Sequence, residues 1–187
     1  MFVNKVDQDV FLRMLQAKDA EALFRLTDES RTVLREWLSW VDETKNIENS
    51  RAFIDTCFEQ YNNRRGLTTG IFYKEQLAGV VGFHAFSWSN RIGYIGYWLG
   101  RDFQGRGIMT RSVRALIHYG FQELKLNRIE IRCASGNKKS HAIPERLGFK
   151  QEGYIRQAEW LYDHYVDHIV YGMLADEWLN KEMVAVE

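Results

Sequence analysis

A basic stretch with two glycines, near the middle of the chain, carries the clearest chemical signal. It reads Gln104-Gly105-Arg106-Gly107-Ile108-Met109-Thr110 and lies where a predicted strand ends and a predicted helix begins. The first N–H groups of a helix have no acceptor within the helix and carry about half a positive charge, so they attract anions. Glycines let the main chain approach an anion closely because no Cβ intrudes. The stretch therefore predicts a phosphate-binding loop.

The charges around this loop favour the same interpretation. Arg101, Arg106, Arg111 and Arg114 surround it, with only Asp102 in opposition. A local basic excess in a neutral protein suits a phosphorylated ligand. A plain glycine turn leading into a helix with solvated arginines is the alternative, because the spacing matches neither the Gly-x-Gly-x-x-Gly of dinucleotide folds nor the lysine-terminated loop of nucleotide triphosphatases.

The elements that position the loop follow from hydrophobic periodicity. Spacings of three and four residues predict helices, and alternation with β-branched and aromatic residues predicts strands. The predicted strands are Val10–Leu15, Leu67–Tyr73, Leu77–Trp88, Arg91–Leu99, Arg128–Cys133, Lys150–Tyr162 and His164–Leu174; the predicted helices are Asp19–Leu38, Glu48–Tyr61, Met109–Leu124 and Ser140–Leu147, before a frayed amphipathic tail. The order β-α-α-β-β-β-α-β-α-β-β predicts an α/β (α+β) fold, with a mixed central sheet of about seven strands and flanking helices.

Composition excludes several classes of protein. The 187 residues are on the scale of one domain, and no linker or repeat divides them, so residues 1–187 are predicted to form a single domain. Twenty-five Lys and Arg balance twenty-five Asp and Glu, which argues against a DNA-coating protein. Cys57 and Cys133 form no CxxC, so no disulfide framework or metal site is expected. With no signal-like or membrane-spanning stretch, we expect a soluble cytoplasmic protein.

Two motifs in this element order resemble the GNAT superfamily of acetyl-CoA-dependent N-acetyltransferases, along nearly the whole chain. Gln104-x-x-Gly107 is similar to its (Arg/Gln)-x-x-Gly-x-(Gly/Ala) signature, although Met109 stands where many relatives carry Gly or Ala. Residues 137–149, from Asn137-Lys138-Lys139-Ser140 to Leu147-Gly148-Phe149, resemble its second motif. Ile95-Gly96-Tyr97-Trp98-Leu99 is similar to the RimJ/RimL-like branch, which acetylates protein N-termini, including those of ribosomal proteins.

The resemblance implies how acetyl-CoA is bound. N–H groups of Gly105 to Thr110 would hold the coenzyme A pyrophosphate, helped by Arg106 and Arg111, and the edge of strand Tyr97–Leu99 would pair with the pantetheine amides. Strand Arg128–Cys133 would splay away to open the cleft, and the amide of Leu99 or Trp98 would stabilise the oxyanion. The residues expected to bind the cofactor are Tyr97, Trp98, Leu99, Gln104, Gly105, Arg106, Gly107, Ile108, Met109, Thr110, Asn137 and Ser140.

Two residues are expected to be catalytic. Ser140 would help protonate the coenzyme A thiolate; its other interpretation is the N-cap of the following helix, with Pro144 in the first turn. Many members of the branch carry Glu just before the Ile-Gly-Tyr-Trp run, where this chain has Tyr94. Glu159 in the penultimate strand is the best replacement as general base, and a surface carboxylate is its competing interpretation. The base has a modest task because an α-amine has a pKa of about 7.7–8.0.

The histidines give weaker signals. His164 and His168 are four residues apart on a strand, about 13 Å, which is too far for a shared metal. His84 and His141 could face the cleft, but lone histidines are more often structural, so neither is assigned a role.

A nucleophilic cysteine is disfavoured, because Cys133 lies in a predicted core strand and Cys57 on the apolar face of a helix. An apolar cluster at the end of the first helix is predicted to form core and cleft wall: Trp37, Leu38, Trp40 and Val41.

The predicted activity is direct transfer of an acetyl group to a primary amine, in particular the N-terminal α-amine of a protein such as a ribosomal protein. Two alternatives stay open: a small-molecule acceptor (polyamine, aminoglycoside or amino acid) and an acyl-CoA-binding protein without turnover. No direct nucleic-acid or membrane partner is expected. Apolar residues in the last strand and at Trp178-Leu179 make a homodimer plausible.

Overall fold

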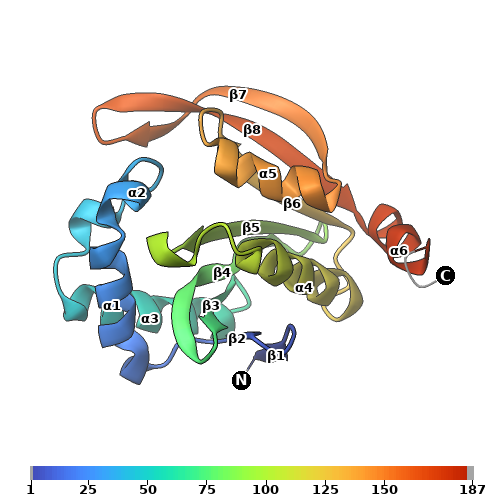
Figure 1. Ribbon diagram of the computed structural model, residues 1–187. Coiled ribbons are helices and arrows are strands. Elements are labelled where there is room, and N and C mark those ends of the chain that lie inside the picture. The colour runs from blue at the N-terminus through green and yellow to red at the C-terminus, as the bar shows by residue number, and fades with distance from the viewer. Residues whose placement is uncertain (1, 185–187) are drawn as a thin grey trace.

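One mixed sheet of eight strands organises the molecule (Figure 1). The computed structural model describes residues 2–184, and its strands lie in the order β1-β2-β3-β4-β5-β6-β8-β7. The strands are β1 (Val3–Lys5), β2 (Val10–Arg13), β3 (Leu67–Tyr73), β4 (Gln76–Ser87), β5 (Ile92–Leu99), β6 (Arg128–Ala134), β7 (Lys150–Leu161) and β8 (His164–Leu174). The α-helices are α1 (Ala20–Glu29), α2 (Arg31–Arg35), α3 (Ile47–Asn62), α4 (Ile108–Gln122), α5 (Lys138–Leu147) and α6 (Ala175–Val184), with 3-10 turns η1 (Ala17–Asp19), η2 (Val41–Glu43) and η3 (Arg101–Phe103).

The predicted α/β class and element order are confirmed, with differences at the two ends of the chain and in the first predicted helix. The sheet has one strand more than predicted, because the short β1 pairs with β2 at its outer edge. β2 ends at Arg13 rather than at Leu15. The predicted tail is the helix α6, whose Trp178 is 2% exposed and lies near Phe121. Residues 185–187 of that tail lie outside the described residues.

The predicted helix Asp19–Leu38 is wrong as one continuous element. It breaks at Ser30, between α1 and α2. The Arg31 side chain donates to the carbonyl oxygens of Val41, at 2.7 Å, and of Thr44. These bonds hold the following segment against α2, and Trp37, Leu38 and Trp40 lie in turns or irregular structure instead of on a helix.

Helices cover the two faces of the sheet with different cores. On one face, called here the α4 face, Ile95 and Ile131 belong to the apolar core that contains α4 residues such as Val113. On the other, called the α1 face, Val80 packs with residues of α1 and α3, and Trp98 lies against this second core. Because successive strand residues point to opposite faces, this division tells which face each residue of β5, β6 and β8 occupies.

Among the described residues, no helix is long and apolar enough to cross a membrane.

Candidate functional site

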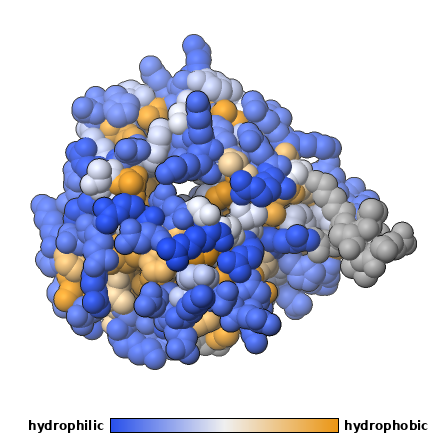
Figure 2. Space-filling model, in the orientation of Figure 1, coloured by the Kyte–Doolittle hydropathy of each residue, from blue (hydrophilic) through white to orange (hydrophobic). Residues whose placement is uncertain are grey.

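The centre of the sheet opens where β5 and β6 diverge. These parallel strands pair over only four positions, from Ile92 with Arg128 to Ile95 with Ile131. Beyond them, Gly96–Leu99 pairs with β4 alone, while Arg132–Ala134 pairs with β8. Figure 2 shows an opening in the molecular surface at this place, between the positions of β5 and α5 in Figure 1. The predicted splaying of strand Arg128–Cys133 is confirmed.

The free edge of β5 presents particular amides to this opening. The Gly100 N–H donates to the Ala78 carbonyl at 2.8 Å, which makes this a hydrogen-bonded antiparallel pair. Such pairs alternate along a ladder, so Trp98 is also bonded to β4, and the N–H groups of Tyr97 and Leu99 point into the opening. Of the two amides predicted for the oxyanion, only that of Leu99 faces the opening.

The glycine loop forms an open cradle at the start of α4. Gly105 and Gly107 have φ values of +74° and +68°, in the left-handed region that favours glycine. Gly107 is the N-cap residue, and no atom lies within 4 Å of where a Cβ on either glycine would stand. The side chains of Ile108 and Met109 are buried. The loop can therefore offer main-chain N–H groups to an anion.

Side chains of α5 reach across to this cradle. Lys139 Nζ donates to Gln104 Oε1 at 3.1 Å, and Gln104 Nε2 donates to the Leu99 carbonyl at 3.3 Å. Arg146 donates to Thr110 Oγ1 at 2.8 Å. Gln104 thus ties the end of β5 to α5, and two cations of α5 that the sequence analysis did not select stand at the rim.

The arginines near the cradle differ in their partners. Arg106 is exposed, whereas Arg101 pairs with Asp102 at 3.2 Å. Arg111 donates to Asp7 Oδ2 at 2.5 Å, from the turn between β1 and β2. Burial acts to raise the pKa of Asp7, but hydrogen bonds from main-chain amides and from Arg111 outweigh it and hold the pKa below its usual value.

The start of α5 differs from the prediction in two ways. Asn137 is the N-cap, and its Oδ1 accepts from the Ser140 N–H at 3.1 Å. Ser140 is the third residue of the helix, so its predicted capping role is wrong. Pro144 lies inside the helix rather than in its first turn. Gly148, with φ of +78°, ends the helix as predicted.

Three polar side chains meet where β5, β6 and α5 converge. The Ser140 hydroxyl lies 3.2 Å from Cys133 Sγ and 3.4 Å from the Tyr97 hydroxyl. Burial raises the pKa of Cys133 and holds that of Tyr97 well above its usual value, so both stay protonated near neutral pH. This cluster can position a hydroxyl hydrogen-bond donor, but it does not favour a thiolate nucleophile.

Aromatic side chains border the opening on the α1 face. The rings of Trp40 and Trp98 lie 5.8 Å apart, and Trp37 packs so closely on Gly136 that a Cβ there would meet its ring at 3.0 Å. The expected cleft wall is therefore present, built from turns rather than from a helix.

Glu159 is exposed to solvent only in part and has a specific partner. Its Oε2 lies 3.0 Å from Nε2 of His168 on β8. A bulge makes this contact: β7 uses four residues from Ile155 to Glu159 where β8 uses two, from His168 to Val166. Gln157 in the bulge has φ of +49°, and its N–H donates to Asp167 at 2.6 Å.

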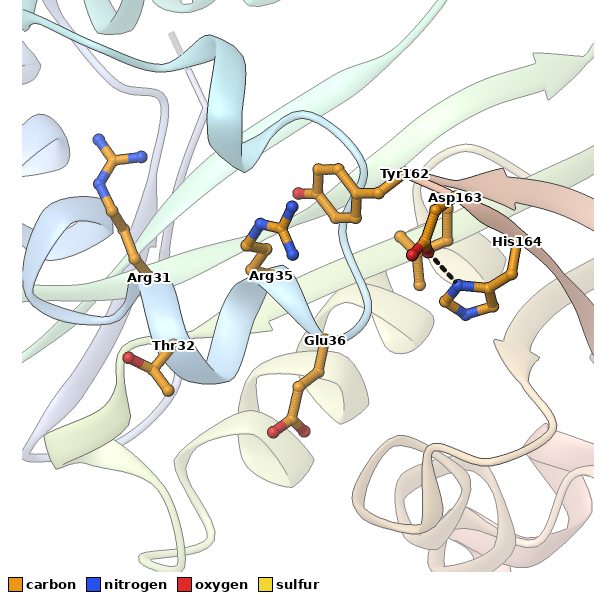
Figure 3. A pocket seen from close by; sticks show the side chains of 8 residues that line it. Arg31, Thr32, Arg35, Glu36, Tyr162, Asp163 and His164 are labelled. Atoms are coloured by element: carbon orange, nitrogen blue, oxygen red, sulfur yellow. Dashed lines mark hydrogen bonds and ion pairs between the residues drawn. The ribbon is translucent and has the colours of Figure 1, made fainter.

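The turn between β7 and β8 contacts α2 beside a hollow of about 490 Å³ (Figure 3). The Tyr162 hydroxyl donates to the Leu38 carbonyl at 2.6 Å, and the Arg35 guanidinium lies 3.9 Å from the centre of the Tyr162 ring. Arg35 is also paired with Asp42 at 2.9 Å. The basic side chains that line this hollow already have partners, Arg31 in Asp28, Arg35 in Asp42 and His164 in Asp163, so the hollow is a joint between two elements.

His141 has structural surroundings. His141 is buried between the Tyr171 hydroxyl at 3.0 Å and the Ala134 carbonyl at 2.8 Å. Burial, with a contribution from Arg132, lowers the pKa of His84. Within residues 2–184, no group of three or more His, Cys, Asp or Glu is placed to hold a metal ion.

The chain is similar to known acetyltransferases along most of its length. Residues 9–150 match the model of the acetyltransferase (GNAT) domain family. The ribosomal-protein-serine acetyltransferase of Escherichia coli (strain K12) is 30% identical over 172 residues, 92% of this chain and 96% of that protein.

Two solved structures share the fold closely. The microcin C7 self-immunity acetyltransferase MccE, in complex with acetyl-CoA and AMP, superposes with a TM-score of 0.88 and 35% identity, covering 91% of this chain and 94% of that one. RimL, a ribosomal L7/L12 alpha-N-protein acetyltransferase, was solved with coenzyme A disulfide-bonded to a cysteine; it gives a TM-score of 0.90 and 30% identity, covering 94% and 99%.

Proposed function

Because the chain belongs to the GNAT family of acetyltransferases, it is an acetyl-CoA-dependent N-acetyltransferase, and we propose that its acceptor is the N-terminal α-amine of a protein, of the ribosomal-protein type. The observation that carries this proposal is the opening between β5 and β6, with an open anion cradle on one side and an aromatic wall on the other. The relatives named for ribosomal-protein acetylation support the acceptor class.

The cradle fits the phosphates of acetyl-CoA. We assign the pyrophosphate to the N–H groups of Gly105 to Thr110, because an added Cβ would enter the space in front of both glycines. Arg106, with Lys139 and Arg146 of α5, supplies positive charge at the rim. When bound, the acetyl thioester supplies the group to be transferred.

The β5 edge and α5 supply the polar groups for the transfer. The Tyr97 and Leu99 main-chain groups pair with the pantetheine amides, and the Leu99 N–H stabilises negative charge on the acetyl oxygen. The Ser140 hydroxyl gives a proton to the departing sulfur. We place removal of the amine's proton at Glu159 and the group hydrogen-bonded to it.

A small-molecule amine is the second candidate acceptor. It is favoured by the similarity to MccE, a microcin self-immunity acetyltransferase whose structure holds AMP. A chain that binds acetyl-CoA without turnover is the third.

Cytoplasmic location and a homodimer complete the proposal. The homodimer does not rest on Trp178, which is buried in its own subunit, but on exposed aromatic side chains of β7 and β8. These are Tyr154, Trp160 and Tyr165, which are 53%, 52% and 57% exposed.

Release of free thiol from acetyl-CoA tests the acceptor directly. The panel contains peptides that begin with Ser or Ala, the same peptides with a blocked N-terminus and an internal Lys, and a polyamine, an aminoglycoside and a free amino acid. We expect turnover with the free N-termini only. Turnover confined to small amines would transfer the assignment to the second candidate, and binding without any turnover would support the third.

A further inference from the structure

His168 lies between Glu159 and the opening of the sheet. β8 is flanked by β6 on one side and β7 on the other, so His168 is one strand closer to β6 than Glu159 is. In the ladder His168 faces Ala134, the residue that follows Cys133 at the diverging end of β6. The side chain of His168 is 17% exposed, compared with 34% for that of Glu159. The imidazole is therefore the more enclosed member of the pair.

His168 also lies on the side from which an acceptor would enter. Its neighbour Ile169 packs against the core on the α4 face. Alternation places His168 on the opposite, α1 face, together with Trp98 of β5. The anion cradle belongs to α4, so a cofactor seated there reaches the opening from the other face. The pair of His168 and Glu159 is thus on the acceptor side.

The carboxylate determines which ring nitrogen carries hydrogen. An ionised carboxylate only accepts hydrogen bonds, so Nε2 of His168, 3.0 Å from Glu159 Oε2, must be the protonated nitrogen. In the neutral ring Nδ1 is then the basic atom. No hydrogen bond to Nδ1 from another described residue occupies that atom.

We propose that His168, through Nδ1, is the group that takes the proton from the acceptor amine, and that Glu159 is a positioning residue that holds the ring and its tautomer. This inference rests on the proposed acetyl transfer. A base held by an orienting carboxylate is also found in hydrolase triads, with the roles of the two ring nitrogens exchanged. It differs from direct proton removal by Glu159, whose Oε2 is occupied by the imidazole.

The protons in this scheme balance. Nδ1 takes one proton from the ammonium form of the amine and later releases it to solvent. The lone pair thus freed forms the C–N bond as the C–S bond breaks. Of the two protons left on the attacking nitrogen, one stays in the amide and the other replaces the proton that the Ser140 hydroxyl gives to the sulfur.

Charged groups around His168 come from three strands. Glu159 faces it from β7, Asp167 precedes it on β8, and Arg132 lies on the same face of β6. A test must therefore distinguish the effect of Glu159 on His168 from the effects of Asp167 and Arg132.

The test compares His168→Gln, Glu159→Gln and the double variant, with the best peptide acceptor, between pH 6 and pH 9. At pH 7 only about a tenth of an α-amine is neutral, so each single variant should lose about tenfold in kcat/KM, and the loss should vanish near pH 9. Because the two residues act as a unit, the double variant should lose no more than either single one.

A second measurement does not depend on turnover. Imidazole ¹⁵N NMR of the wild-type protein at pH 8 should show His168 with hydrogen on Nε2, and Glu159→Gln should give a mixture of tautomers. His164→Gln is the matched control, because His164 lies on the same strand and pairs with Asp163 at 2.7 Å. It should leave the pH profile unchanged.

The outcomes separate the two levels of the proposal. A tenfold loss in Glu159→Gln with wild-type kinetics in His168→Gln would overturn the role of His168 and return the base to Glu159. Wild-type pH profiles in both variants would overturn the pair while leaving acetyl transfer intact. Wild-type protein that turns over no amine would instead remove the proposed function.

Discussion

The Tyr97 hydroxyl donates a hydrogen bond to the main-chain carbonyl of Ser140, at 3.0 Å. In a regular helix this carbonyl would accept the N–H of the residue four positions later, which is Pro144 and has no N–H. A side chain of β5 thus replaces a missing main-chain donor of α5, and it holds the helix against the diverging strand.

Tyr97→Phe should therefore destabilise the protein. It leaves the Ser140 carbonyl without a donor, which typically costs about 1–3 kcal/mol in the free energy of unfolding measured with urea. Pro144→Ala restores a main-chain donor and should recover part of that loss in the double variant. An equal loss with and without Pro144→Ala would show that the carbonyl is not what Tyr97 stabilises.

Ser140→Ala and Asn137→Ala should change different properties of the protein, turnover in the first case and stability in the second. Asn137 caps α5, so its removal should lower the free energy of unfolding by about 1 kcal/mol. Ser140→Ala should leave the cap intact and lower turnover at every pH up to 9, because protonation of the sulfur does not depend on the amine. Urea titration and thiol release on both variants measure this. A capping-sized loss of stability in Ser140→Ala would contradict the assignment.

Gly107→Val should abolish acetyl-CoA binding. The valine side chain would enter the empty space before the α4 amides. The left-handed φ at position 107 would also cost the variant about 1–2 kcal/mol in stability. In the wild-type protein, acetyl-CoA at a hundredfold excess over its Kd should raise the free energy of unfolding by about 2.7 kcal/mol, which is measured as a rise in Tm. Gly153→Ala is the control, since its Cβ would meet only Val170 at 3.9 Å. A full ligand-induced rise in folded Gly107→Val would remove the cradle from the binding site.

Asp7→Asn should tighten acetyl-CoA binding by releasing Arg111. The side chains of Arg111 and Asp7 are each about one-third exposed, and such ion pairs contribute up to about 1 kcal/mol. If that energy no longer opposes the binding of acetyl-CoA, its Kd should fall by up to about fivefold. Calorimetry at low and high salt measures the change, which should shrink at high salt. Asp9→Asn removes the same charge next to it without touching Arg111. An equal gain in Asp9→Asn would mean a general charge effect.

The sequence predicts best what depends on neighbouring residues. The glycine loop, the start of α4 and Gly148 follow from local rules for caps and left-handed turns, and they lie within one or two residues of the prediction. The break at Ser30 could not be predicted, because the apolar spacing continues through it. The contacts around it are distant in sequence: the Arg101 N–H donates to Ser30 Oγ at 3.0 Å, and Arg31 donates to carbonyls ten and thirteen residues away.

Tertiary partners explain why the sequence misplaces Pro144 and indicates no role for His168. Proline is tolerated inside α5 because Tyr97, forty-three residues before Ser140, supplies the donor. Spacing along the chain relates His168 only to His164, whereas its actual partner, Glu159, depends on the register of β7 against β8. Only the bulge brings Glu159 opposite Val166, and hydrophobic periodicity does not predict a bulge.

The bulge in β7 has a further consequence for how this molecule behaves among copies of itself. β7 is the last strand of the sheet, so one side of its main chain has no partner strand. A straight edge of this kind invites a strand from another molecule and leads to aggregation. The kink at Gln157, tied down by Asp167, interrupts the row of donors and acceptors midway along the edge. The feature that aligns Glu159 with His168 thus also protects the sheet from open-ended growth.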